Sequence, residues 1–382
     1  YDEGQEPKET TFLLYMVGQN DLKNSLLANI EDLKTGLSLS DVDANVLVYA
    51  DISSTPTLYQ IAKDRSGNVR QTTVKTYPDQ YSVDPSVMKD VINDVLAQYP
   101  ARHYGVTFSS HADGSLYRQQ TVGKRSFGYE GSQGLGMNIT DIRQALDGCP
   151  RLDLILFDAC MMASVETAYE LKGNARYFLA APNSVPAEGF PYDKVLPYIL
   201  RMDASGLSRA AEGYMTYFRN NGVEWDNFVS VSLTDLSRMD SLALYMDSLF
   251  QDETVHQRVR ELDRDRLQHF ENGYPLYDYG EWVDSVGGAC RYVAEVRRVL
   301  DDAVVYKAHN DYSSVNDYTA MPEIPVKDGA FCGLNTYVPD EIPGLFYTEA
   351  AQMEYFTSQK WYRDAGFWRV PLYNVFEPEE TE

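Results

Sequence analysis

Positive charge is scarce in this chain of 382 residues, and long apolar runs are missing from it. The 33 Lys and Arg residues are outnumbered by 57 Asp and Glu residues, so the formal net charge is −24. Nucleic acid is not expected as a partner, because phosphate binding needs clustered basic side chains. No apolar run approaches the length of a membrane-spanning helix, so no membrane span is expected. The acidic excess suits cationic substrates or bound divalent cations, and it equally suits solubility alone.

Cysteine is also sparse, and its spacing excludes several classes of protein. No CxxC pair occurs, which argues against a zinc ribbon or a thioredoxin-like motif. Four cysteines in a chain of this length do not make a disulfide scaffold, and they leave the cellular compartment open. The four are Cys149, Cys160, Cys290 and Cys332.

Apolar patterning predicts strands that alternate with helices through the first 200 residues. This alternation indicates an α/β fold with a mostly parallel sheet sandwiched by helices and right-handed crossovers. The expected strands are 11–17, 45–51, 57–63, 104–111, 152–160 and 177–181, and the expected helices are 21–34, 85–98, 139–146 and 161–172.

The later residues predict helices at 207–220, 235–250 and 288–304, with strands at 228–233 and 331–338. No internal repeat or linker divides the chain. We therefore expect a core at 11–240 and a C-terminal portion at 241–382 that packs on it. Residues 1–10 are polar and lack an initiator Met. They are expected to form a disordered or linker tail, left by removal of a signal segment or marking a fragment boundary.

Two of the expected strands end in reactive side chains. The strand at 104–111 ends in His111, and the strand at 152–160 ends in Cys160. The carboxyl ends of neighbouring parallel strands open into one crevice. A thiol and an imidazole brought together there are the parts of a cysteine nucleophile and its acid/base partner. The alternative is a buried structural cysteine and a histidine satisfied at a strand end.

Short motifs around these two residues resemble the clostripain family of cysteine peptidases. They are SHADG at 110–114 and FDACMMASVE at 157–166, supported by SFG at 126–128 and GFPYD at 189–193. The resemblance is strong over about residues 11–200 and implies a caspase-like α/β fold with a C-terminal elaboration. One departure is Ala112, where many family members carry glycine after the histidine.

The resemblance implies an endopeptidase that uses a Cys160/His111 dyad. The Cys160 thiolate would attack a peptide carbonyl, and His111 would protonate the leaving amine and later help to activate water. A helix that begins at Met161 would place its positive dipole end near the sulfur. The backbone N–H groups of Ala112 and Cys160 are the expected oxyanion hole.

The family prefers Arg or Lys at P1, the residue before the scissile bond, and a cationic side chain requires carboxylate partners. Asp158 matches the family position for this role, and strand alternation places it on the same face as Cys160. Glu188 is the second candidate. The alternatives are a carboxylate that caps the strand end for Asp158 and a solvated loop charge for Glu188.

Activation by self-cleavage is a further expectation. The interval 112–138 is rich in Gly, Ser and Gln, and long loops inside compact domains are usually functional. Members of the resembling family are zymogens that are cut between the histidine and the cysteine, after a basic residue. The pair Lys124 and Arg125 lies in this interval, with Arg118 as a weaker site. The alternative is an exposed basic pair without a role.

The resemblance alone implies calcium dependence, and no EF-hand spacing supplies ligands to name. It also implies an exported bacterial protein that is secreted, periplasmic or anchored to the cell surface as a lipoprotein. The competing hypothesis is a non-catalytic surface binding protein on a degenerate peptidase scaffold. The presence of both His111 and Cys160 favours the enzyme, and a caspase-fold peptidase with another P1 preference remains a third possibility.

Overall fold

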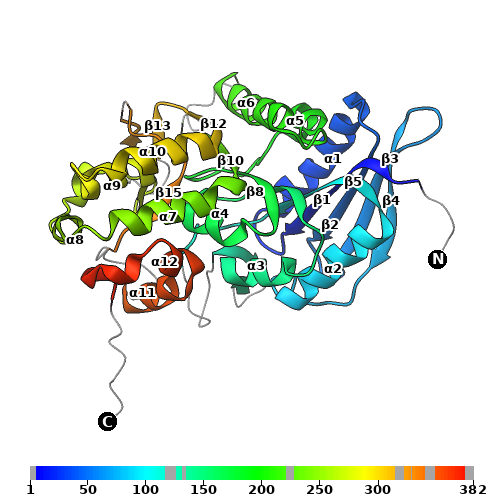
Figure 1. The fold of residues 1–382 in the computed structure, drawn as a ribbon. Coiled ribbons are helices and arrows are strands. Elements are labelled where there is room, and N and C mark those ends of the chain that lie inside the picture. The colour runs from blue at the N-terminus through cyan, green and yellow to red at the C-terminus, as the bar shows by residue number, and fades with distance from the viewer. Residues whose placement is uncertain are drawn as a thin grey trace, which may run out of the picture.

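A large mixed sheet forms the centre of the computed structural model, which describes residues 6–116, 126–130, 135–220, 228–314, 322–327, 329–339 and 349–374. In these ranges the central sheet has nine strands in the order β12-β10-β9-β8-β5-β1-β2-β3-β4 (Figure 1). Its strands are β1 (Lys8–Val17), β2 (Ala44–Asp51), β3 (Thr57–Lys63), β4 (Val69–Thr76), β5 (Ala101–Ser109), β8 (Leu152–Asp158), β9 (Ala175–Ala180), β10 (Ser230–Asp235) and β12 (Val304–His309).

The middle strands β9, β8, β5, β1 and β2 run parallel to one another, and antiparallel strands extend both edges. The expected mostly parallel sheet is therefore confirmed at its centre. The chain order reverses between β1 and β5, because β1 is followed on one side by β2 and is joined on the other by β5. Such a reversal leaves a crevice at the carboxyl ends of the strands.

Helices cover both faces of the sheet (Figure 1). One layer of helices packs on the face of the sheet that carries every second residue of β1, namely Phe12, Leu14 and Met16. The other layer packs on the opposite face, which carries the β1 residues between them. This alternation explains why β1 reads as a continuous apolar run. The first layer holds α1 (Lys23–Leu39), α5 (Tyr192–Ile199) and α6 (Ala204–Asn220), and the second holds α2 (Pro85–Gln98), α3 (Ile139–Leu146), α4 (Val165–Leu171), α7 (Met239–Leu249) and α10 (Tyr292–Ala303).

Short elements complete the described fold. The further helices are η2 (Leu236–Arg238), α8 (Glu253–Arg260), η3 (Arg264–Arg266), α9 (Tyr279–Gly287), α11 (Glu349–Ser358), α12 (Lys360–Asp364), η4 (Phe367–Arg369) and η5 (Pro371–Tyr373). Three two-stranded sheets are formed by β6 (Phe127–Glu130) with β7 (Leu135–Met137), β11 (Leu276–Asp278) with β15 (Asn335–Tyr337), and β13 (Tyr312–Ser314) with β14 (Ile324–Pro325) within the described ranges.

Local signals explain which boundaries were predictable. The helix expected at 85–98 forms as α2, because Asp84 caps it by accepting the N–H of Ser86 and Pro85 occupies its first turn. The helix at 139–146 is likewise confirmed as α3. Strand β4 was not expected. It is polar and lies at the edge of the sheet, so it lacks the apolar run that marks a buried strand.

The helix after Cys160 begins later than expected. The sequence predicted a helix from Met161, but α4 starts at Val165, where the hydroxyl of Ser164 caps it by accepting the N–H of Thr167 at 3.0 Å. Met161 has a φ of 61°, in the left-handed region, and so cannot belong to a right-handed helix. The residues 161–164 form a turn instead.

The C-terminal portion is more closely joined to the core than the sequence indicated. The expected helix at 288–304 begins at Tyr292 as α10, and its last expected residue, Val304, already starts strand β12. β12 pairs with β10 and extends the central sheet. The expected strand at 331–338 shortens to β15, whose Asn335 forms a bridge with Ser164 beside the Cys160 turn.

Candidate active site

His111 and Cys160 follow two neighbouring strands that end level with each other. In the parallel pairing of β5 with β8, Ser109 lies opposite Asp158, and each reactive residue comes two positions later. Both side chains line one cavity of about 460 Å³ at the carboxyl edge of the sheet. The structure therefore brings the expected nucleophile and its expected acid/base partner to the same cavity.

The His111 imidazole is oriented by a third strand end. Its Nε2 atom lies 2.7 Å from Oδ1 of Asp21, which follows β1, the sheet neighbour of β5. The bond from His111 lowers the pKa of the Asp21 carboxyl. Tyr129 presents its ring edge to the imidazole, with the ring centres 6.4 Å apart. Asp21 was given no role beyond the start of the expected helix 21–34, although the residue closely follows the first expected strand, 11–17.

Burial holds the Cys160 thiol in its protonated form. Burial raises the pKa of Cys160 to about 11, and the negative charges of Glu271 and Asp113 oppose ionisation further. The N–H of Val185 points at the sulfur, 3.3 Å away, and acts in the opposite direction. Because α4 begins at Val165, the expected helix dipole at the sulfur is absent from this turn. A base must therefore take the proton when the nucleophile is used.

The turn after Cys160 is strained and is held by hydrogen bonds from distant segments. The left-handed residue Met161 donates its N–H to the carbonyl of Asn183 at 2.8 Å. Its carbonyl accepts the side-chain amide of Asn335 at 3.1 Å. A left-handed conformation in a non-glycine residue costs about 1–3 kcal/mol and persists only where its surroundings impose it. These two contacts supply that support directly beside Cys160.

Ala112 lies in a short strand pairing with Phe127. The flanking hydrogen bonds run from the Gly128 N–H to the His111 carbonyl at 2.8 Å and from the Asp113 N–H to the Ser126 carbonyl at 3.0 Å. In such a pairing, the N–H of the central residue points away from the partner strand. The Ala112 N–H is thus turned away from the 126–128 segment and is compatible with the expected oxyanion role.

The structure places Asp158 and Glu188 on the wall of the same cavity. The buried Asp158 carboxylate accepts the N–H of Phe190 at 3.2 Å and the hydroxyl of Tyr192 at 2.9 Å. Burial raises its pKa to about 6. Gly189 makes room for it, since a Cβ atom there would lie 2.6 Å from Asp158 Oδ2. Glu188 is exposed, and its carbonyl accepts the amide of Asn29.

A third carboxylate of the cavity was missed at the level of sequence. Glu271 lies in a turn of the C-terminal portion, more than 100 residues from Cys160, and it also lines the cavity. Its carboxylate accepts the hydroxyls of Ser184 at 2.5 Å and Ser314 at 2.9 Å. No motif or strand end marks this residue, so only the folded chain reveals it.

The expected processing pair Lys124 and Arg125 lies outside the described residues. The two ends of that interval are described, and they lie together. The hydroxyl of Ser126 donates to the carbonyl of Leu116 at 2.6 Å, and both residues are buried. The described residues on either side of the interval 117–125, Leu116 and Ser126, are therefore in contact with each other.

Two further expectations concern ions and membranes. In the described ranges, no group of three or more His, Cys, Asp or Glu side chains is arranged to hold a metal ion. No step is therefore assigned to calcium. None of the described helices combines the length and apolar character needed to cross a membrane.

Comparisons with known proteins agree on the family to which the chain belongs. The clostripain family, peptidase C11, matches residues 14–340. Clostripain from Hathewaya histolytica is 22% identical over 93% of this chain and 79% of its own length. A secreted C11 cysteine protease from Bacteroides thetaiotaomicron, solved with an irreversible peptide inhibitor, is 29% identical with a TM-score of 0.81, covering 94% of this chain and 99% of that one. An inactive zymogen C11 protease from Parabacteroides distasonis is 26% identical with a TM-score of 0.78, covering 95% and 99%.

The fold and these matches define a cysteine peptidase with a caspase-like α/β fold. The chain belongs to the clostripain family. The expected family, fold class and enzyme class are therefore confirmed. The roles of individual residues and the preferred substrate are developed below.

Proposed function

We propose that this peptidase is an endopeptidase that cleaves peptides after Arg or Lys through a Cys160/His111 dyad. The observation that carries the proposal is the shared cavity. It brings the sulfur and the imidazole together with three carboxylates, Asp158, Glu188 and Glu271. A cavity with this charge attracts cationic side chains to the nucleophile.

In the proposed reaction, His111 takes the Cys160 proton and the sulfur attacks the carbonyl carbon of the scissile bond. The backbone N–H groups of Ala112 and Cys160 stabilise the oxyanion. His111 then returns the proton to the leaving amine as the C–N bond breaks, leaving a thioester. Water hydrolyses the thioester while His111 takes its proton and the sulfur leaves. Asp21 orients the imidazole throughout through its 2.7 Å contact.

Asp158 is the proposed principal acceptor of the P1 side chain, assisted by Glu188. The Asp158 carboxylate is fixed by Phe190 and Tyr192, so it presents one direction to the cavity. A guanidinium or ammonium group that replaces water at this carboxylate also favours its ionised form. The exposed Glu188 adds charge at the mouth and contributes less.

The enzyme is proposed to be made as a precursor that is cut after Lys124 or Arg125. The contact between Leu116 and Ser126 supports this proposal, because it keeps both ends of the interval 117–125 beside His111 after a cut. The related Parabacteroides protein was solved as an inactive zymogen. Export from a bacterial cell is part of the same proposal, in line with the secreted relative from Bacteroides thetaiotaomicron.

Fluorogenic peptides that differ only at P1 test the substrate preference. Arg and Lys peptides are expected to be cleaved at least about tenfold faster than their citrulline and norleucine counterparts. An Arg-directed acyloxymethyl ketone should label Cys160 and abolish activity. If the processed enzyme favours neutral P1 residues, the proposed specificity is wrong. If no peptide is cut and the sulfur is not labelled, the dyad is wrong as well.

The intact mass of the purified protein tests processing. The wild type should give two fragments that meet at residue 124 or 125, and Cys160→Ala should give one uncut chain. If the Cys160→Ala variant, purified by itself, still gives two fragments, another protease makes the cut. Assays in EDTA and with added calcium test the calcium dependence, which stays a prediction.

A further inference from the structure

A turn of the C-terminal portion reaches the catalytic cavity. It comprises residues 271–274 and is closed by a hydrogen bond from the Tyr274 N–H to the Glu271 carbonyl at 3.3 Å. Glu271 lines the cavity that Cys160 and His111 share. The hydroxyl of Tyr274 bonds Asp113 at 2.7 Å, two residues after His111. The turn thus contacts the segment just after His111 through Tyr274 and contributes a carboxylate to the cavity through Glu271.

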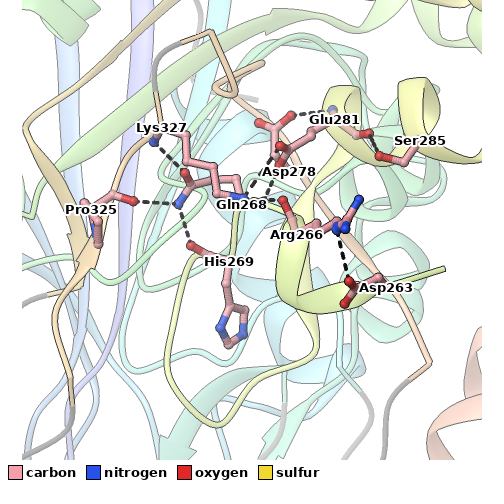
Figure 2. Close-up of polar contacts among 9 residues, drawn as sticks. All are labelled: Asp263, Arg266, Gln268, His269, Asp278, Glu281, Ser285, Pro325 and Lys327. Atoms are coloured by element: carbon pink, nitrogen blue, oxygen red, sulfur yellow. Dashed lines mark hydrogen bonds and ion pairs between the residues drawn. The ribbon is translucent and has the colours of Figure 1, made fainter.

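The chain that leads into this turn is firmly held. Figure 2 shows the buried Gln268 at the centre of its polar contacts. Its side-chain amide donates to the carbonyls of His269 and Pro325 and accepts the N–H of Lys327 at 2.7 Å. Its backbone N–H donates to the Glu281 carboxylate. Because these contacts fix the residues just before the turn, the position of Glu271 is set by the fold.

The Glu271 carboxylate is also held in direction. Ser184 donates to one of its oxygens and Ser314 to the other. Ser184 immediately precedes Val185, whose N–H points at the Cys160 sulfur. The carboxylate is therefore fixed to the segment that lines the nucleophile. Preorganised charged groups recognise an ionic ligand at lower entropic cost than mobile ones.

The position of Glu271 is electrostatically unfavourable in the free enzyme. Its negative charge raises the pKa of Cys160 and so opposes formation of the thiolate. A cationic side chain bound at Glu271 would cancel this effect, because an opposite charge nearby favours the ionised sulfur relative to the empty cavity. The presence of a carboxylate at this position is therefore explained better by substrate binding than by structural support alone.

We propose that Glu271 is a second specificity residue, which accepts a Lys or Arg side chain of the peptide at a position flanking P1. The inference rests on the proposed function, in which Asp158 and Glu188 accept P1. The two acceptors are attached to different parts of the chain. Asp158 is bonded to the segment after β9, whereas Glu271 comes from the C-terminal turn and is bonded to Ser184 and Ser314.

A substrate scan with matched variants tests this inference. Arg is kept at P1, and Arg is compared with citrulline at each flanking position in turn. In the wild type, Arg should be preferred by about tenfold in kcat/KM at one position. Glu271→Gln should lose this preference, so that the ratio of Arg to citrulline cleavage at that position falls to about one, whatever rate change the two peptides share. The exposed Glu253 serves as a control, since Glu253→Gln makes the same change in charge far from the cavity and should behave as wild type.

Three results would overturn the inference. If the wild type shows no flanking preference, Glu271 does not select a cation. Equal losses for Arg and citrulline peptides in Glu271→Gln would indicate a supporting role only. Loss of the P1 preference would make Glu271 a P1 acceptor. If the wild type prefers a neutral P1, the proposed function fails, and the same flanking scan on that neutral-P1 series still decides the role of Glu271.

Discussion

Two regions meet at the catalytic cavity and contribute different things to it. The strand-end side, which follows β1, β5 and β8, supplies Asp21, His111 and Cys160. The C-terminal side, residues 271–337, supplies Glu271 and the amide of Asn335. The first region carries groups suited to making and breaking bonds, and the second carries groups suited to holding the site and selecting substrates.

This difference follows from how each region is built. Parallel strands deliver their ends to one edge wherever their register matches, so reactive side chains can be grouped there by short local segments. The C-terminal side reaches the same place only through long-range contacts. Asn335 shows this best, because its side-chain amide joins the carbonyls of Met161 at 3.1 Å and Pro182 at 2.7 Å. It thereby ties the turn after Cys160 to the next loop of the cavity.

The sharpest test of the comparison removes the groups on the strand-end side. Cys160→Ala and His111→Ala should each lower kcat by at least about 10⁴-fold, because residues that act as one catalytic unit fail together. Single-turnover assays with a P1-Arg peptide measure the loss. The double variant should be no worse than either single one. Additive losses would show that the two residues do not act as a dyad.

The next largest effect is expected at Asp158. Asp158→Asn should lower kcat/KM for P1-Arg peptides by about 10–100-fold, the value of a charge-assisted bond, and affect citrulline peptides far less. Because burial raises the pKa of Asp158 to about 6, the wild-type ratio of Arg to citrulline cleavage should rise as the pH increases through 6. The ratio cancels the pH effects that the two peptides share. A ratio that is independent of pH, or one that rises equally in Asp158→Asn, would contradict this assignment.

A smaller loss is expected when the C-terminal side is changed. Asn335→Ala removes one hydrogen bond to the turn after Cys160, at Met161, and one to the next loop, at Pro182, so kcat should fall by about tenfold with KM little changed. The comparison predicts that the loss appears equally for every P1 residue, since Asn335 positions the nucleophile and touches no substrate. Asn174→Ala is the matched control, because this asparagine lies near the start of β9, away from the cavity. A change in P1 preference in Asn335→Ala would blur the division between the two regions.

The same division explains what could be predicted from sequence. His111, Cys160 and Asp158 lie at or just after strand ends. The apolar run before each of them predicts the strand and therefore where the residue lies. Glu188 follows the next strand and was also within reach. Glu271 and Asn335 carry no such mark, because their roles arise from contacts with residues more than 40 positions away. The start of α4 was misjudged for a similar reason, since Asn183 and Asn335 hold Met161 in a conformation that local propensity disfavours.

The smallest predicted effect concerns the pH dependence of stability and a buried pair of carboxyl groups on the strand-end side. No catalytic role is assigned to this pair. Glu130, next to Tyr129, is 2% exposed and hydrogen bonds with Asp51, which also accepts Ser82 and Gln19. Burial, then Asp51, raises the pKa of Glu130, and Tyr15 and Tyr49 are the other titratable groups beside it.

The sign of the pH dependence follows from this raised pKa. The folded protein keeps the Glu130 proton at a pH where the unfolded chain has released it, so the contribution to stability is full below about pH 4.5 and declines as the pH rises toward the folded pKa. The slope from this one group is at most about 1.4 kcal/mol per pH unit. The amide of Glu130→Gln can still donate to Asp51, and this variant should lose the slope. Urea unfolding at about pH 5, 7 and 8 measures the free energy of unfolding, with Glu253→Gln as the control variant. Parallel slopes in the two variants would mean that the pair is ionised in the folded protein. A flatter slope with unchanged P1-Arg cleavage would show that the strand-end side also contains residues that serve only to support its chemistry.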